Sequence, residues 1–122
     1  MTDVLKTCIF LIINLIFPIM ASRVLFVVYD NGSYDNTFPM GVGALSAVLK
    51  EDGHEVTIWN QDIHHYADES LTDYLDNNKF DVVILSLIAG YYQYKKMKNL
   101  SEAINRSKQR PYYLMGGYGP TP

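Results

Sequence analysis

Cysteine is almost absent from this chain, and so is an excess of positive charge. Cys8 is the single cysteine among 122 residues. With one cysteine, these residues cannot form an internal disulfide, and they cannot hold a metal cluster that needs several cysteine ligands. Lys and Arg number 10 against 13 Asp and Glu, which gives a net charge of −3. This balance argues against a general nucleic-acid-binding protein, and we expect no nucleic-acid partner.

A long apolar run is confined to the amino terminus. Residues 8–20 are almost wholly apolar, but a membrane span needs about 20 residues. Three interpretations of residues 1–22 stay open: a read-through ahead of a natural start at Met20, a signal or anchor within residues 4–20, and a helix packed on the domain. We expect a cytoplasmic protein under the first interpretation, and a membrane-associated or exported one under the second. Residues 23–122 then form one domain.

After this leader, strand-like and helix-like segments alternate. The sequence predicts strands over 23–29, 55–59, within 81–90 and over 112–115, and helices over 40–52, 71–77 and 91–109. Such alternation predicts parallel βαβ units with right-handed crossovers. We expect an α/β fold, a flavodoxin-like or Rossmann-like three-layer parallel sheet in the order 2-1-3-4. That fold has a fifth strand and further helices, so we expect an incomplete sheet whose fourth strand is an exposed edge that favours self-association.

The most apolar of these segments ends in a small polar residue. Val82 to Leu85 are continuously apolar, and Ser86 follows them. An unbroken apolar run is typical of a strand covered on both faces. Ligands of open α/β sheets bind at the carboxyl ends of the strands. Gly116 and Gly117 follow the fourth strand, and glycines there let a ligand approach the backbone closely. We therefore expect Ser86 and the glycine pair to line one slot.

These segments resemble the cobalamin-binding domain. That family carries Asp-x-His-x-x-Gly, then Ser-x-Leu, then Gly-Gly, and its serine and glycines line the slot for the dimethylbenzimidazole tail of the cofactor. Ser86-Leu87-Ile88 is similar to the second motif, and Gly116-Gly117 to the third. The first motif falls on residues 39–44, where Gly41 stands in place of the cobalt-ligating histidine.

Further motifs resemble the amino-terminal domain of cobalamin-dependent radical S-adenosylmethionine enzymes. The segment that holds Pro39, Gly41 and Gly43 is similar to that group's Pro-x-Gly-x-x-x-Leu, and Gly53-His54-Glu55-Val56 matches its Gly-His-Glu-Val. Gly116-Gly117-Tyr118 opens a stretch similar to its Gly-Gly-x-His-Pro-Thr. The resemblance implies that cobalamin is bound without a protein histidine on cobalt, so that no residue of the chain ligates the metal.

The resemblance also implies which residues bind the cofactor and what the chain lacks. The implied cofactor-binding residues are Pro39, Gly41, Gly43, Ser86, Leu87, Ile88, Gly116, Gly117 and Tyr118. No residue is implied to be catalytic, because the catalytic half of such enzymes holds an iron–sulfur cluster and S-adenosylmethionine through Cys-x-x-x-Cys-x-x-Cys, which this chain does not contain. We therefore expect a truncated cobalamin-binding domain, not catalytic by itself, from a methyltransferase-like radical enzyme.

Two other functions stay open. The amino-terminal half of a two-domain glycosyltransferase also begins with a strand, a Gly-containing loop, a helix and Gly-His-Glu-Val, in which case the similarity at Ser86 would be accidental. A non-catalytic truncated fragment would instead associate through its bare sheet face.

Several residues that resemble ligands are predicted to be structural. We expect Asp62, His64 and His65 to lie in a solvated loop rather than at a metal site, because adjacent residues rarely point at one ion. His54 is expected in a surface turn. Two roles are open for the tyrosines after the third strand, which either flank a planar ring or lie half-buried on a helix; they are Tyr91, Tyr92 and Tyr94.

Overall fold

The structure is a computed structural model that describes residues 21–32, 38–87 and 93–117. The predictions for residues 1–20, Ile88, Tyr91, Tyr92 and Tyr118 lie outside these residues. The strands are β1 (Arg23–Val28), β2 (Glu55–Asn60), β3 (Val82–Leu87) and β4 (Tyr112–Gly117). The helices are α2 (Met40–Glu51), α3 (Gln61–His64), α4 (Ser70–Asn77) and α5 (Gln93–Arg106).

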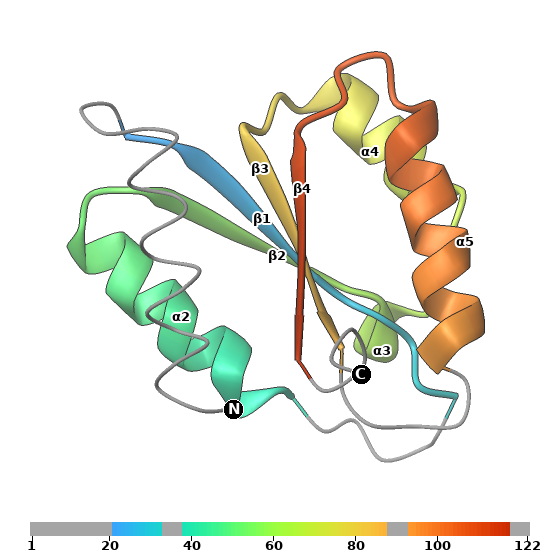
Figure 1. Ribbon diagram of the computed structural model, residues 1–122, viewed down its shortest axis with the longest axis horizontal. Coiled ribbons are helices and arrows are strands. Elements are labelled where there is room, and N and C mark those ends of the chain that lie inside the picture. Colours follow the sequence, from blue (N-terminus) through green and yellow to red (C-terminus); the bar gives the residue numbers. More distant parts are fainter. Residues whose placement is uncertain (1–20, 33–37, 88–92, 118–122) are drawn as a thin grey trace.

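The four strands form one parallel sheet in the order β2-β1-β3-β4. Helix α2 covers one face, and α4 and α5 cover the other (Figure 1). The predicted α/β fold and strand order are therefore confirmed. Within the described ranges no helix is long and apolar enough to cross a membrane.

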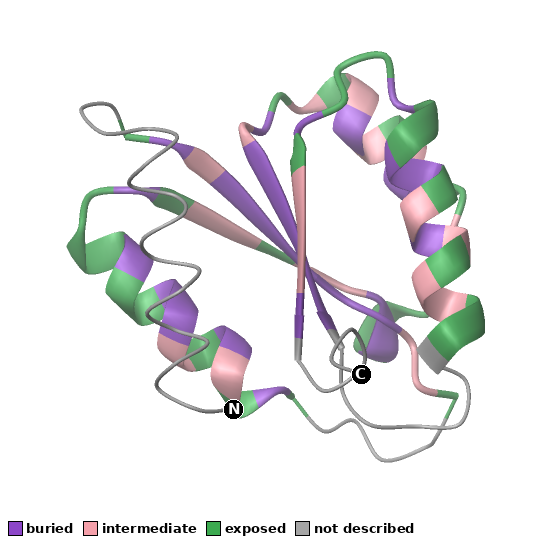
Figure 2. Cartoon of the chain, in the orientation of Figure 1, coloured by how far each residue is buried: buried purple, intermediate pink, exposed green. Residues whose placement is uncertain are grey.

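Alternation of side chains along β1 and β3 divides the core into two halves. Leu25 and Val83 lie in the cluster on the α4 and α5 face, whereas Phe26 and Ile84 lie in the cluster on the α2 face. The two central strands are buried almost throughout, as Figure 2 shows. Burial on both faces explains why these strands read as unbroken apolar runs rather than as alternating patterns.

The structure differs from the predicted elements at three places. Residues 61–64 form the short helix α3 within the predicted loop, because the side chain of Asn60 accepts a hydrogen bond from the Ile63 amide and caps the turn. Helix α5 ends at Arg106 rather than at residue 109. Strand β4 continues through both glycines, because Gly116 and Gly117 pair with β3.

Asp76 of α4 accounts for the early end of α5. Its carboxylate accepts hydrogen bonds from the Ser107 hydroxyl at 2.8 Å and the Lys108 amide at 2.7 Å. These bonds draw the chain away from the helical path directly after Arg106.

The inward face of α2 follows a helical repeat. Val42, Leu45, Ser46 and Leu49 are buried, whereas Val48 is exposed. These four buried positions are spaced i, i+3, i+4 and i+7 from Val42, which is the spacing of one helix face, and this face packs on the sheet.

Candidate functional site

A row of paired residues crosses the carboxyl end of the sheet. Val28 of β1 pairs with Asn60 of β2 on one side and with Ser86 of β3 on the other. Ser86 in turn pairs with Gly116 of β4, and Leu87 pairs with Gly117. The structure thus brings together the serine and the glycine pair that the sequence placed at one slot. Their role in binding a ligand stays a prediction.

The row forms a tightly packed floor. Ser86 is 4% exposed, Val28 is also buried, and Gly116 is buried beside them. Because Ser86 has a small side chain and Gly116 has none, little side-chain bulk stands at the carboxyl ends of β3 and β4. A ligand group that reaches this floor would meet backbone and one hydroxyl rather than branched side chains.

Pro39, Gly41 and Gly43 lie at the same edge, because α2 begins where the connection from β1 ends. Pro39 is buried, Gly41 is half-buried and Gly43 is exposed. A Cβ atom added to Gly43 would lie 3.5 Å from a ring carbon of Phe38, which is an ordinary contact distance. Packing within the described residues therefore does not require glycine at position 43.

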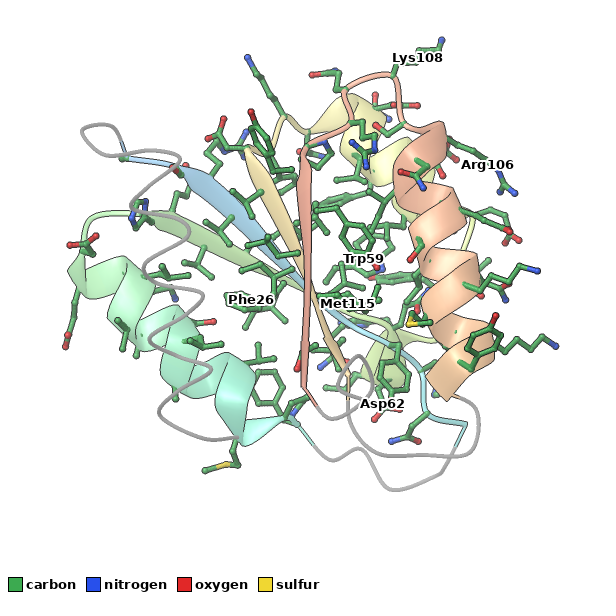
Figure 3. All side chains as sticks on the ribbon, in the orientation of Figure 1. Phe26, Trp59, Asp62, Arg106, Lys108 and Met115 are labelled. Atoms are coloured by element: carbon green, nitrogen blue, oxygen red, sulfur yellow. The ribbon has the colours of Figure 1, made fainter. Side chains whose placement is uncertain are left out.

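Exposed apolar side chains gather around this edge. They lie at the starts of α2 and α5, within α3 and just after it, and together we name them the apolar rim: Phe38, Met40, Ile63, Tyr66 and Tyr94. Met40 is 86% exposed and Tyr94 is 72% exposed. Figure 3 shows Asp62 at this end of the sheet, among side chains of the helix starts. Tyr94 is thus not the half-buried helix residue that one prediction allowed.

Asp62 contradicts the prediction of a solvated loop. It is only 3% exposed, and its carboxylate accepts a hydrogen bond from the Asn31 amide at 3.1 Å. The neighbouring histidines diverge: His64 is exposed and stacks on Tyr66, whereas His65 bonds to Asp30. No three His, Cys, Asp or Glu side chains of the described residues converge into a metal site.

The pKa of the Asp30 carboxyl group is lowered. Partial burial acts to raise the pKa of this carboxyl group. Hydrogen bonds from the His65 ring and the Gly32 amide, with the charges of His65 and Lys96, outweigh burial and hold the pKa below its ordinary value. The Asp30 side chain therefore stays ionised at neutral pH, directly after β1.

His54 contradicts the prediction of a surface turn. It is 7% exposed, and its Nδ1 atom accepts a hydrogen bond from the Ser22 amide at 3.0 Å. Gly53 before it has a φ of 91°, in the left-handed region that glycine adopts readily. The Gly-His-Glu-Val motif therefore lies at the amino end of the sheet, opposite the candidate site, and links the starts of β1 and β2.

A shallow groove also lies away from the candidate site. Its volume is about 610 Å³, and its lining comes from the connections that lead into β3 and β4, including Lys79, Lys108 and Arg110. This groove is at the amino ends of the strands, so it does not coincide with the row at Ser86.

The strand order and the helices on both faces define a doubly wound α/β domain, and domains of this class bind their ligands at the carboxyl ends of parallel strands. The family model described as the B12 binding domain matches residues 28–122. This match spans most of the chain, and the chain belongs to the B12-binding domain family. No curated protein and no solved structure matches it significantly. Membership supports cobalamin binding as the general function.

The described residues fit a large, partly apolar cofactor. The apolar rim offers uncovered apolar surface around the edge, and the paired Ser86 and Gly116 place little side-chain bulk at the carboxyl ends of β3 and β4. The sequence holds no histidine between β1 and α2, where the related motif carries its cobalt ligand. The sequence predicted Ser86 and the glycine pair at this edge, but it predicted neither the apolar rim nor the polar contacts of α3. Scattered exposed side chains have no periodic pattern, and a four-residue helix is too short to show one.

Proposed function

We propose that this domain binds cobalamin with the corrin ring over the carboxyl edge and the nucleotide tail in a slot at the carboxyl ends of β3 and β4. The pairing of Ser86 with Gly116, in a chain of the B12-binding family, is the observation that carries this proposal. The tail would be lined by Ser86, Leu87, Ile88, Gly116, Gly117 and Tyr118, and the corrin would approach Pro39, Gly41 and Gly43. The protein supplies position and electrostatics, and the cofactor supplies the chemistry.

The proposal includes a cobalt atom without a protein histidine. Gly41 stands where the related motif has its ligand. His54 is buried at the opposite end of the sheet, and the ring of His65 is hydrogen bonded to Asp30. These placements support a mode in which the chain holds the cofactor through its tail and its ring edges.

We further propose that the domain is part of a cobalamin-dependent radical S-adenosylmethionine enzyme of methyltransferase-like activity. The four motifs near Pro39, Gly53, Ser86 and Gly116 support this proposal by their order along the chain. The iron–sulfur cluster and S-adenosylmethionine would bind outside this chain. Coding sequence beyond Pro122 that contains Cys-x-x-x-Cys-x-x-Cys would support this proposal, and its absence would contradict it.

The glycosyltransferase alternative loses its main support. It rests on the Gly-His-Glu-Val similarity, and in this structure Gly53 and His54 serve to join β1 and β2. A motif with that structural task suits any parallel sheet of this connectivity. The family match favours cobalamin over a nucleotide sugar.

The edge strand β4 also supports the proposal of self-association. All six of its residues, Tyr112–Gly117, are uncharged, and β3 is the one strand that pairs with it among the described residues. Charged residues and prolines within an edge strand usually prevent pairing with another chain, and β4 has neither. A second copy that adds its own β4 would extend the sheet.

The test of cobalamin binding is retention of the coloured ligand. The folded protein is mixed with hydroxocobalamin or methylcobalamin, passed through gel filtration and read by its visible spectrum. Free ligand at a concentration of about 100 times its dissociation constant would add roughly 2.7 kcal/mol to the free energy of unfolding. If the protein retains no colour and its melting temperature does not shift, the proposal is overturned.

The site is tested by one variant and its matched control. Gly117→Trp places a large ring at the carboxyl end of β4, where the tail is proposed to bind, and we expect it to abolish retention. Lys108→Trp adds the same ring to an exposed position at the opposite end of the sheet, and we expect retention to be unchanged. Equal retention by both variants would show that the tail lies elsewhere.

A further inference from the structure

The segment that leaves β1 is held by α3 through two hydrogen bonds. The Asn31 amide donates to Asp62 Oδ1 at 3.1 Å, and His65 Nδ1 lies 2.7 Å from Asp30 Oδ2. The other oxygen of Asp30 accepts from the Gly32 amide at 2.8 Å. Residues 30–32 therefore have a bond at each position. They begin two residues beyond Val28, the centre of the paired row.

The backbone of α3 directs its two functional side chains to this segment. Asn60 starts the helix, and His65 ends it with a φ of 53°, in the left-handed region that residues other than glycine seldom adopt. The His65 amide donates to the Gln61 carbonyl at 2.7 Å and closes the turn. The turn sends the His65 ring to Asp30, while the ring of His64 packs on Tyr66.

Helix α3 is itself anchored to the rest of the domain. The fully buried Gln61 donates from Nε2 to the Tyr66 carbonyl and to Asp68. Asp68 also accepts from Lys96 at 3.3 Å and from Asn99 at 3.2 Å, both on α5. A chain of polar contacts thus runs from α5 through α3 to the segment after β1. Lys96 is half-buried in this chain of contacts.

We propose that Asp62 and His65 are positioning residues for the ligand edge, which hold Asp30, Asn31 and Gly32 in place before the ligand arrives. A segment that is already ordered loses less conformational entropy on binding, so the ligand binds more tightly. The inference rests on the proposed binding of cobalamin at this edge. In this role Asp62 and His65 act through residues 30–32 and need not touch the cofactor themselves.

Affinity for hydroxocobalamin tests the role of each residue. Removal of a buried acceptor by Asp62→Ala should raise the dissociation constant about tenfold. Loss of the more exposed pair by His65→Ala should raise it roughly two- to fivefold. Asp62→Asn keeps an oxygen that accepts from the Asn31 amide, so it should restore most of the affinity. Lys108→Ala changes an exposed side chain at the opposite end of the sheet and should leave the affinity unchanged.

Amide hydrogen exchange of the ligand-free protein gives a readout that does not depend on cobalamin. The Asn31 amide should exchange slowly in the natural protein and in Asp62→Asn, and faster in Asp62→Ala. If the natural protein fails to retain cobalamin, the proposed function fails while exchange at Asn31 still tests the contact. Fast exchange at Asn31 in the natural protein would overturn the inference. Unchanged affinity in His65→Ala and in a folded Asp62→Ala would overturn it as well.

Discussion

The Ser22 amide and the His54 ring are joined by a hydrogen bond that connects the start of β1 to the start of β2. Because Nδ1 accepts this bond, it carries no proton, and the ring is held in one tautomer. The next residues reinforce the connection, since the Glu55 amide donates to the Ser22 carbonyl at 2.9 Å. The carboxylate of Glu55 also lies 3.4 Å from Arg23.

We predict that His54→Leu destabilises the domain. Leucine fills a similar volume but leaves the buried Ser22 amide without this acceptor, so the free energy of unfolding should fall by about 1–3 kcal/mol. Urea denaturation followed by circular dichroism measures the change. The control is His64→Leu, at an exposed position, which should differ little from the natural protein. Equal stability of both variants would contradict a structural role for His54.

We predict that the stability decreases in acid through Asp76. Its bond with the Ser107 hydroxyl, followed by that with the Lys108 amide, lowers the pKa of Asp76 below the ordinary value of 3.8. The folded state therefore favours the ionised form. Its contribution is present above about pH 4 and is lost as the pH falls through the lowered pKa. Denaturation between pH 2.5 and 6 should give a flatter acid limb for Asp76→Asn, and an unchanged slope would contradict this prediction.

We predict that the stability also decreases at high pH, through Tyr113. Burial raises the pKa of Tyr113 above its ordinary value of 10.0, and the hydrogen bond with Ser101 offsets this only in part. The unfolded chain thus loses this proton first, so stability is present below about pH 10 and is lost as the pH rises through the raised pKa. Urea denaturation from pH 8 to 11.5 should show a shallower alkaline decline for Tyr113→Phe. A decline of equal slope would exclude Tyr113 as its source.

We predict that the apolar rim contributes to cofactor affinity. Tyr94→Ser removes an exposed ring at the carboxyl edge and should weaken cobalamin binding by roughly 0.5–1.5 kcal/mol. Tyr112→Ser is the matched control, because Tyr112 is an exposed tyrosine at the opposite end of the sheet. Spectroscopic titration with methylcobalamin compares the two. Equal losses, or none, would show that the rim does not contact the corrin.

We predict that a charge on β4 prevents self-association. Tyr112→Lys adds a cation to an exposed position of the edge strand and should shift the protein toward the monomer. Sedimentation velocity across a range of concentrations measures the shift. Cobalamin retention by the variant shows that the sheet is still formed. A natural protein that stays monomeric at every concentration would contradict association through β4.

The sheet was predictable because its signal is strong and local. Val24 to Val28 and Val82 to Leu85 are unbroken apolar runs, and helix patterns between them leave parallel crossovers as the one arrangement. The strand order placed Ser86 and the glycine pair at the same edge, and the structure adds that Ser86 pairs with Gly116. Sequence reasoning therefore identified the floor of the candidate site before its geometry was known.

The missed features depend on side chains that meet across long separations. His54 becomes buried because a backbone amide 32 residues earlier needs an acceptor, and no periodicity records this. Asp62 is a buried carboxylate for the same reason, since its partner Asn31 lies in another connection. Helix α3 is too short for a 3.6-residue repeat to be counted. Polar residues within a loop do not reveal which of them the fold will enclose.

One consequence follows from the position of Gly116 on the edge strand. The floor at the carboxyl ends of β3 and β4 exists only while β4 is docked, so cobalamin bound there, as proposed, would link strand docking to cofactor occupancy. Each bound cobalamin would hold the last strand in the sheet, and each detachment of that strand would release the tail. Edge strands open at a lower free energy than central ones. Local opening of β4, rather than global unfolding, would then set the residence time of the cofactor.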